Sequence, residues 1–177
     1  GTTEIAVMSL GGVVFSKSLR VAGDAMDGAI INYMRKKFNL LIGESTAEKI
    51  KKEIGTAIPT SNNVFLMKGR DIRTGTPKEI SLTEEDACEA LMPILNQMLS
   101  AIKEALENTP PELSADLVDM GLVLTGGGAL LKNIDKLISK DTGLPVTIAD
   151  NPLECVALGT GKALENEELF SNIQTSL

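Results

Sequence analysis

The chain has 177 residues, a formal net charge of −7, 43% hydrophobic residues and no histidine. This size and composition allow one compact domain or two small lobes, and the lack of histidine excludes histidine-based acid–base catalysis and the usual zinc sites. The acidic charge and the 3% aromatic content argue against phosphate-neutralising and base-stacking modes of nucleic-acid binding.

The two cysteines and the apolar runs bear on location. Cys88 and Cys155 lie far apart in sequence, each within a helical pattern, and two buried, reduced thiols fit a cytosolic protein. No apolar run approaches the roughly 20 residues of a membrane span, so the sequence predicts a cytoplasmic chain.

A β-hairpin is predicted first. Alternating apolar residues predict strands over residues 2–10 and 13–22, joined by a tight turn at Gly11 and Gly12. Asp24 then caps a predicted helix that runs to Phe38. The chain therefore opens as two strands followed by a helix.

The next stretch forms a small unit of its own. A second helix is predicted over residues 45–54, with Gly55 as its stop. A polar loop over residues 56–63 leads into two short strands, 64–71 and 78–82, with a turn between them. This combination of helices and a hairpin reads as an insertion.

The second half of the sequence alternates helices with strands. Helices are predicted over residues 84–108, with Pro93 inside, and over residues 112–120. A strand at 122–124 precedes a helix at 128–140, a strand at 145–149 and a last helix from Pro152. An early hairpin followed by such alternation predicts an α/β fold with a mixed sheet.

The first candidate site is the triple glycine Gly126-Gly127-Gly128, which separates a strand from a helix. In this setting we expect the N–H groups of Gly127, Gly128 and Ala129 to be unpaired and to point at a ligand. The alternative is a sharp turn in which glycines only avoid steric strain.

Charged residues supply the other candidates. Glu48 and Lys51 share a helix face, where Glu48 could bind ribose hydroxyls and Lys51 could border an adenine or a phosphate. The alternatives are that Glu48 closes a capping box begun at Ser45 and that Lys51 is a solvated surface residue. For Asp24 and Asp27, a helix cap and an exposed carboxylate are favoured over a metal pair.

The N-terminal residues complete the set of candidates. Gly1, Thr2 and Thr3 open the first strand. Their backbone N–H groups and hydroxyls could line phosphate oxygens, although a plain strand start explains the same residues.

Three of these pieces together resemble the actin superfamily, and most closely its bacterial members of the MreB type. Residues 1–7 (Gly-Thr-Thr-Glu-Ile-Ala-Val) resemble the end of the second phosphate loop, and residues 124–131 (Leu-Thr-Gly-Gly-Gly-Ala-Leu-Leu) resemble the adenosine motif. Residues 47–55 resemble the helix that contacts purine and ribose, and residues 20–24, 109–113 and 157–164 also read like this family.

The resemblance implies a ribonuclease-H-like core with a small inserted α+β subdomain. By this reading residues 1–28 and 84–177 form the core (actin-type IIA), and residues 29–83 form the insertion (actin-type IIB). The nucleotide contacts carried over from the family are Gly1, Thr2, Glu48, Lys51, Gly126, Gly127, Gly128, Ala129 and Leu130. No residue of the chain is assigned to a metal or to catalysis.

The family's function follows as an expectation. The resemblance implies an ATP-binding cytoskeletal protein that forms membrane-associated filaments on the inner membrane face and directs cell-wall synthesis and rod shape. It implies ATP or ADP with Mg²⁺ as cofactor, and self-association and shape machinery such as RodZ as partners. Membrane contact would come through a first half that this chain lacks.

Two alternatives within the superfamily remain, a chaperone ATPase domain and a sugar kinase fragment. The family's Asp-Ile-Gly-Gly run and first phosphate loop are not in the sequence. We therefore expect slow ATP hydrolysis of the full-length protein and none from this segment alone.

Overall fold

A computed structural model describes residues 1–9, 12–110 and 121–149, and these fold into two compact units. Unit 1 contains Gly1–Ala22, the stretch from Gln97 to Leu130, and the chain from Ile134 onward. Unit 2 contains Gly23–Asn96 and the short segment Leu131–Asn133. The predicted helix at 112–120, the helix from Pro152, Gly11 and Cys155 lie outside the described residues.

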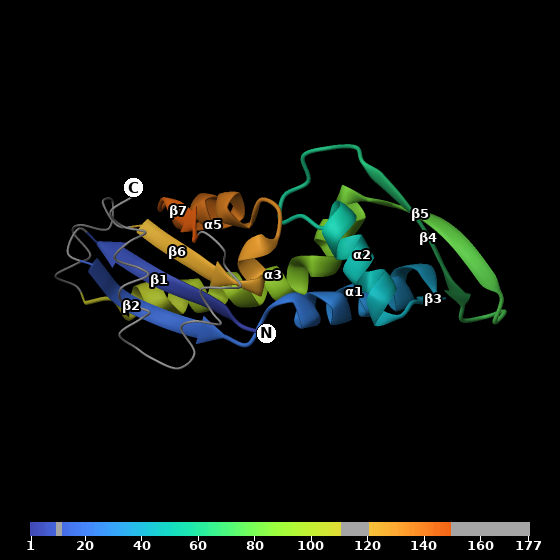
Figure 1. Cartoon of the computed structure of the whole chain (residues 1–177), viewed down its shortest axis with the longest axis horizontal. Helices are drawn as coiled ribbons and strands as arrows, with labels where there is room; N and C mark the ends of the chain where they lie inside the picture. Colours follow the sequence, from blue (N-terminus) through green and yellow to red (C-terminus); the bar gives the residue numbers. More distant parts are fainter. Residues whose placement is uncertain (10–11, 111–120, 150–177) are drawn as a thin grey trace. The chain divides into compact units, whose positions relative to one another are not determined.

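Unit 1 is built on a four-stranded mixed sheet in the order β2-β1-β6-β7 (Figure 1). Its strands are β1 (Thr3–Ser9), β2 (Gly12–Leu19), β6 (Gly121–Gly126) and β7 (Val146–Ile148). The β1 strand pairs antiparallel with both β2 and β6, whereas β6 and β7 are parallel. The predicted opening hairpin and the α/β class are confirmed.

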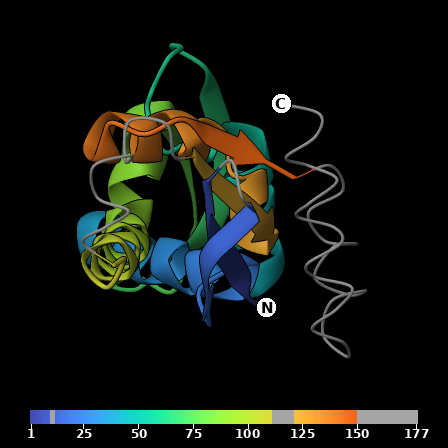
Figure 2. The same ribbon diagram turned by 90° about the vertical axis from the view of Figure 1, so that its left-hand side faces the viewer.

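The central strand β1 carries buried apolar residues on both faces. Ile5 and Val7 stand opposite Leu124 and Leu122 on one face. The other face carries a second apolar cluster, whose buried members are Ala6, Met8, Val123 and Ala149. The helix α5 (Ile134–Thr142) and the second half of α3 (Glu84–Glu107) lie on the same side of this sheet (Figure 2).

Unit 2 combines helices with a three-stranded antiparallel sheet in the order β3-β4-β5. Its helices are α1 (Gly23–Phe38), α2 (Glu44–Ile54) and the first half of α3. Its strands are β3 (Leu40–Leu41), β4 (Val64–Asp71) and β5 (Pro77–Thr83). The predicted hairpin is confirmed, and the two-residue strand β3 is an addition that the sequence pattern did not indicate.

The α1–α2 pair packs along apolar residues at helical spacing. These residues are Met26, Ile30 and Met34 of α1, and Ala47, Ile50 and Ile54 of α2, each at most 5% exposed. In α3, Pro93 lies inside the continuous helix.

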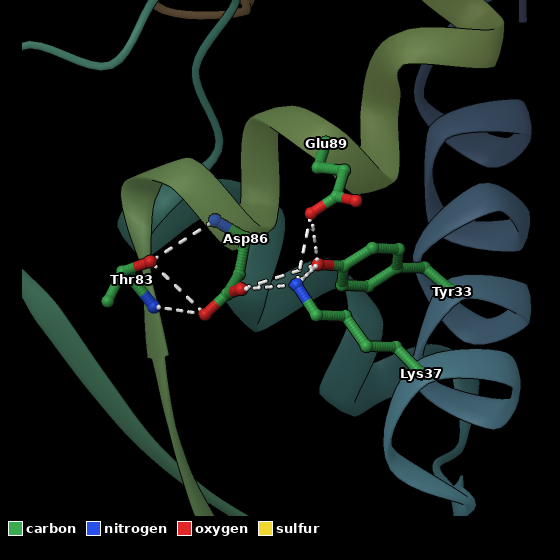
Figure 3. A network of polar contacts seen from close by, with 5 residues as sticks. All are labelled: Tyr33, Lys37, Thr83, Asp86 and Glu89. Atoms are coloured by element: carbon green, nitrogen blue, oxygen red, sulfur yellow. Dashed lines mark hydrogen bonds and ion pairs between the residues drawn. The ribbon is translucent and has the colours of Figure 1, made fainter.

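A polar network joins α1 to the start of α3 within unit 2 (Figure 3). Lys37 Nζ donates to Tyr33 Oη at 2.7 Å, to Glu89 at 3.0 Å and to Asp86 at 3.2 Å. Asp86 also forms a reciprocal cap with Thr83, because each backbone N–H is bonded to the other residue's side chain. Burial is the main cause that raises the pKa of Tyr33 to about 12.

The prediction of one helix over residues 128–140 is wrong for the first residues of that range. A 3₁₀ helix, η2 (Gly127–Leu130), follows β6, and α5 begins only at Ile134. Between them Asn133 has a φ of 64°, a left-handed conformation that a regular α-helix cannot contain. The apolar spacing of residues 130–138 therefore continues across a break in the backbone.

Candidate functional site

The glycine turn lies where β6 ends beside the beginning of β1. Gly126 stands opposite Thr3 in the strand register and has a φ of 90°. This value is in the region that residues with a side chain rarely adopt. The turn then tightens into η2, in which Gly128 and Ala129 are buried and Leu130 is 58% exposed.

Two of the three N–H groups expected to be unpaired are bonded within unit 1. Gly127 N donates to the Thr2 carbonyl oxygen at 3.3 Å, and Gly128 N donates to Thr3 Oγ1 at 3.1 Å. The expectation is wrong for these groups because the start of β1 supplies acceptors at hydrogen-bonding distance. The same Thr3 hydroxyl donates to the Val21 carbonyl at 2.6 Å. Two hydrogen bonds, one accepted and one donated, therefore hold the Thr3 side chain in place.

Space, as well as backbone conformation, requires glycine in this turn. A Cβ at Gly126 would lie 2.3 Å from the Thr2 carbonyl oxygen, and one at Gly128 would lie 2.2 Å from Thr3 Oγ1. Both distances are far shorter than a van der Waals contact. The turn is thus packed directly on the backbone and hydroxyl of β1, and Leu130 is the large side chain that it exposes.

Glu48 on α2 is exposed and ionised. Its side chain is 51% exposed and lies 3.0 Å from Lys52, one helical turn further on. The hydrogen bond from Lys52 is the main cause that lowers the pKa of Glu48. The capping-box alternative is wrong, because α2 begins at Glu44 after Gly43 and has no side-chain cap.

Lys51 has a different environment, although it lies three residues further along the same helix. Its side chain is 16% exposed, donates to the Gly23 carbonyl at 3.2 Å and lies 2.9 Å from Asp27 Oδ1. The alternative of a solvated surface lysine is therefore wrong. The favoured reading of Asp27 as an exposed carboxylate is wrong as well, since its side chain is 13% exposed.

Among the described residues, no group of three His, Cys, Asp or Glu side chains could hold a metal ion. Asp24 lies in the first turn of α1. Cys88 is a free, half-buried thiol that donates to the Ala57 carbonyl, and burial raises its pKa.

Two residues have contacts at these sites that no local sequence pattern indicates. Thr3 was a candidate phosphate contact, and the structure buries its hydroxyl between Gly128 and Val21. Asp27 was not linked to Lys51, because the two residues are 24 positions apart on different helices and no local pattern connects them.

The predicted site residues divide between the two units. Gly1, Thr2 and the turn Gly126–Leu130 belong to unit 1, with Gly1 exposed and Thr2 half-buried. Glu48 and Lys51 belong to unit 2. Each unit therefore offers its own set of candidate contacts, a backbone turn in one and charged side chains in the other.

Comparisons with known proteins place these features in a family. A family model described as MreB/Mbl protein matches residues 1–172. The chain is 51% identical over 166 residues to the cell shape-determining protein MreB of Escherichia coli, covering 93% of this chain and 48% of that protein. It is 50% identical to the cell shape-determining protein Mbl of Bacillus cereus, covering 94% of this chain and 50% of the relative. The chain thus spans about half the length of these relatives.

Solved structures agree with this placement. The crystal structure of MreB 5 of Spiroplasma citri bound to AMPPNP has a TM-score of 0.80 at 39% identity, covering 100% of this chain and 53% of that one. A MamK double helical filament has a TM-score of 0.59 at 16% identity, covering 92% of this chain and 47% of that one, a likeness that shows the fold alone. The fold is that of the actin superfamily, as predicted.

Proposed function

The chain belongs to the MreB/Mbl protein family, and on that premise we propose that the protein is an ATP-binding cytoskeletal protein that sets cell shape. The protein as a whole polymerises into membrane-associated filaments that direct cell-wall synthesis. The observation that carries the proposal is the identity of about one residue in two to relatives named for determining cell shape.

The nucleotide is ATP or ADP with Mg²⁺, and this chain supplies contacts to its nucleoside end. The proposal is supported by one relative, MreB5 of Spiroplasma citri, which was crystallised both with AMPPNP and with ADP. In the glycine turn, the N–H groups of Gly127 and Gly128 are already bonded to Thr2 and Thr3. A turn whose donors are in use suits van der Waals contact with a base or ribose better than capture of a phosphate.

Individual contacts follow from these environments. Leu130, at 58% exposure, packs against the nucleoside together with Gly126, Gly127, Gly128 and Ala129. Glu48, which stays ionised, accepts hydrogen bonds from ribose hydroxyls, and Lys51 borders the base. Gly1 and Thr2 approach the phosphates through their backbone. No described residue is assigned to Mg²⁺.

Location and partners are proposed on the family resemblance. The protein is cytoplasmic and associates with the inner membrane face, with other copies of itself and with shape machinery such as RodZ. Within residues 1–9, 12–110 and 121–149, no helix is both long and apolar enough to cross a bilayer.

Sedimentation and light scattering of the whole protein, with and without ATP, test the function. Polymer that forms with ATP is the expected result. Sugar phosphorylation without polymer would instead support the sugar kinase alternative, and ATP-dependent peptide binding without polymer would support the chaperone alternative.

A matched pair of variants tests the nucleoside contact. Leu130→Ala should weaken ADP binding about five-fold, since it removes an exposed apolar side chain that binding would bury. Leu66→Ala changes a leucine of similar exposure, 64%, on β4 and should leave the ADP dissociation constant unchanged. Equal ADP dissociation constants for the two variants would show that Leu130 does not contact the nucleotide.

A further inference from the structure

The ion pair between Asp27 of α1 and Lys51 of α2 is an unusual feature of unit 2. Lys51 Nζ lies 2.9 Å from Asp27 Oδ1, and both side chains are largely buried, at 16% and 13% exposure. Within the described residues, Asp27 Oδ1 is a buried atom without an aligned hydrogen bond. Lys51 is therefore the cation that balances this carboxylate.

A buried ion pair of this kind is not expected to add much to the free energy of unfolding. Removing two charges from water costs several kcal/mol per ion before their attraction repays it, so apolar residues of similar volume often serve a fold equally well. The neighbouring contacts of α1 and α2 are indeed apolar, through Met26, Ile30 and Ile50. The pair interrupts an interface that otherwise follows ordinary core packing.

The position of the ammonium is closely defined. Lys51 also donates to the Gly23 carbonyl at 3.2 Å, which occupies one of its three N–H groups, and Asp27 holds the ammonium by charge at 2.9 Å. A Cβ at Gly23 would lie 3.0 Å from Lys51 Nζ, at the limit of close contact. The ammonium thus has a defined place and a charge that Asp27 neutralises, and within the described residues it keeps donor capacity beyond the bond to Gly23.

We propose that Asp27 is a positioning residue for nucleotide binding that acts through Lys51. It holds the ammonium against Gly23 and cancels its charge, so that Lys51 offers one directed hydrogen bond to an uncharged part of the ligand. The inference rests on the proposed function, since it assigns a partner to a residue of the same nucleotide site.

A double-mutant cycle on the whole protein, with ADP affinity measured by calorimetric titration, tests this role. Asp27→Asn and Lys51→Met should each weaken ADP binding about ten-fold, the loss of one well-placed hydrogen bond. The double variant should bind as Lys51→Met does, because Asp27 has no effect once its lysine is absent. Asp27→Glu should restore part of the affinity.

Gly23→Ala gives a second route that keeps both charges. It should displace the ammonium by a few tenths of an ångström and weaken ADP binding in the presence of Lys51, but have no effect in the Lys51→Met background. This variant keeps the inference testable if Asp27→Asn does not fold. Glu79→Gln, which removes the exposed partner of Lys68, is the control and should bind ADP normally.

The outcomes separate the inference from the proposed function. If Asp27→Asn and Gly23→Ala weaken binding by the same factor with and without Lys51, Asp27 does not act through Lys51 and the inference is overturned. If neither change affects ADP binding, it is overturned as well. If the wild-type protein binds no adenine nucleotide, it is the proposed function that fails.

Discussion

The glycine turn of unit 1 and the charged clusters of unit 2 are held in place by opposite means. At Gly126 and Gly128 the closest atoms to an added Cβ belong to the backbone of Thr2 and Thr3 and to the side chain of Thr3, whose hydroxyl is buried. In unit 2, carboxylates and ammonium groups join helices and loops, as in the pairs Asp27–Lys51 and Glu84–Lys132. The turn should therefore be sensitive to added volume, and the clusters to altered charge.

The largest effect is expected from adding one methyl group to the turn. Gly126→Ala combines a φ of 90° with a clash against the Thr2 carbonyl, and should lower the free energy of unfolding by about 4 kcal/mol. Gly143→Ala is the matched control, because Gly143 has a φ of 74° but no atom within 4 Å of an added Cβ. It should cost about 1 kcal/mol. Equal losses in urea denaturation would show that conformation alone, and not packing, requires glycine at Gly126.

A smaller effect is expected from removing a buried charge. Glu84 is 2% exposed, accepts bonds from the Ser61 hydroxyl and the Thr60 N–H, and lies 3.6 Å from Lys132. Glu84→Gln should lower the free energy of unfolding by about 2 kcal/mol at neutral pH. Glu79→Gln, on exposed β5, should change it little.

The pH dependence of Glu84 follows from its pKa. The hydrogen bond from the Ser61 hydroxyl is the main cause that holds the pKa of Glu84 below its ordinary value of 4.5. Its contribution to stability is therefore present above about pH 4.5 and is lost as the pH falls through the lowered pKa. The difference between wild type and Glu84→Gln should shrink in acid, and a constant difference would contradict the charge-based account.

The smallest effect concerns the network around Tyr33, the one tyrosine of the chain. Its ultraviolet phenolate signal should titrate near pH 12 in the folded protein and near its ordinary value of 10.0 in denaturant. Since burial raises this pKa, the associated stability is complete below about pH 10 and is lost as the pH rises toward 12. A folded-state midpoint at the ordinary value would show that the network leaves Tyr33 exposed to water.

Much of the fold could be predicted because local patterns determine it. The strand pattern of residues 64–71 and the acidic first turn of α3 each indicate one structure. The break at Asn133 could not be predicted, because the apolar spacing continues through it and the left-handed backbone is stabilised by distant groups. Asn133 Nδ2 donates to Thr56 Oγ1 and to the Ile58 carbonyl, more than 70 positions away.

The residues of the candidate site stay a prediction, and their partners within the protein could not be predicted. The glycine triplet and the Glu48–Lys51 spacing are visible in the sequence. Their partners depend on contacts between elements that are distant in the chain. Thr2 and Thr3 accept hydrogen bonds from the N–H groups of the turn, and Asp27 forms an ion pair with Lys51. These partners change the expected chemistry, since groups already bonded within the protein are not available to a phosphate.

The segment Leu131–Asn133 has a consequence for how the sequence of unit 2 can evolve. Although its flanking residues belong to unit 1, this tripeptide belongs to unit 2, where Ala57 N donates to the Lys132 carbonyl at 2.9 Å. Unit 2 is thus encoded in two separate pieces. Recombination that exchanged only residues 23–96 between two relatives would combine the loop of one relative with the Leu131–Asn133 segment of the other. Because Asn133 bonds to Thr56, substitutions at these two positions should occur together among relatives.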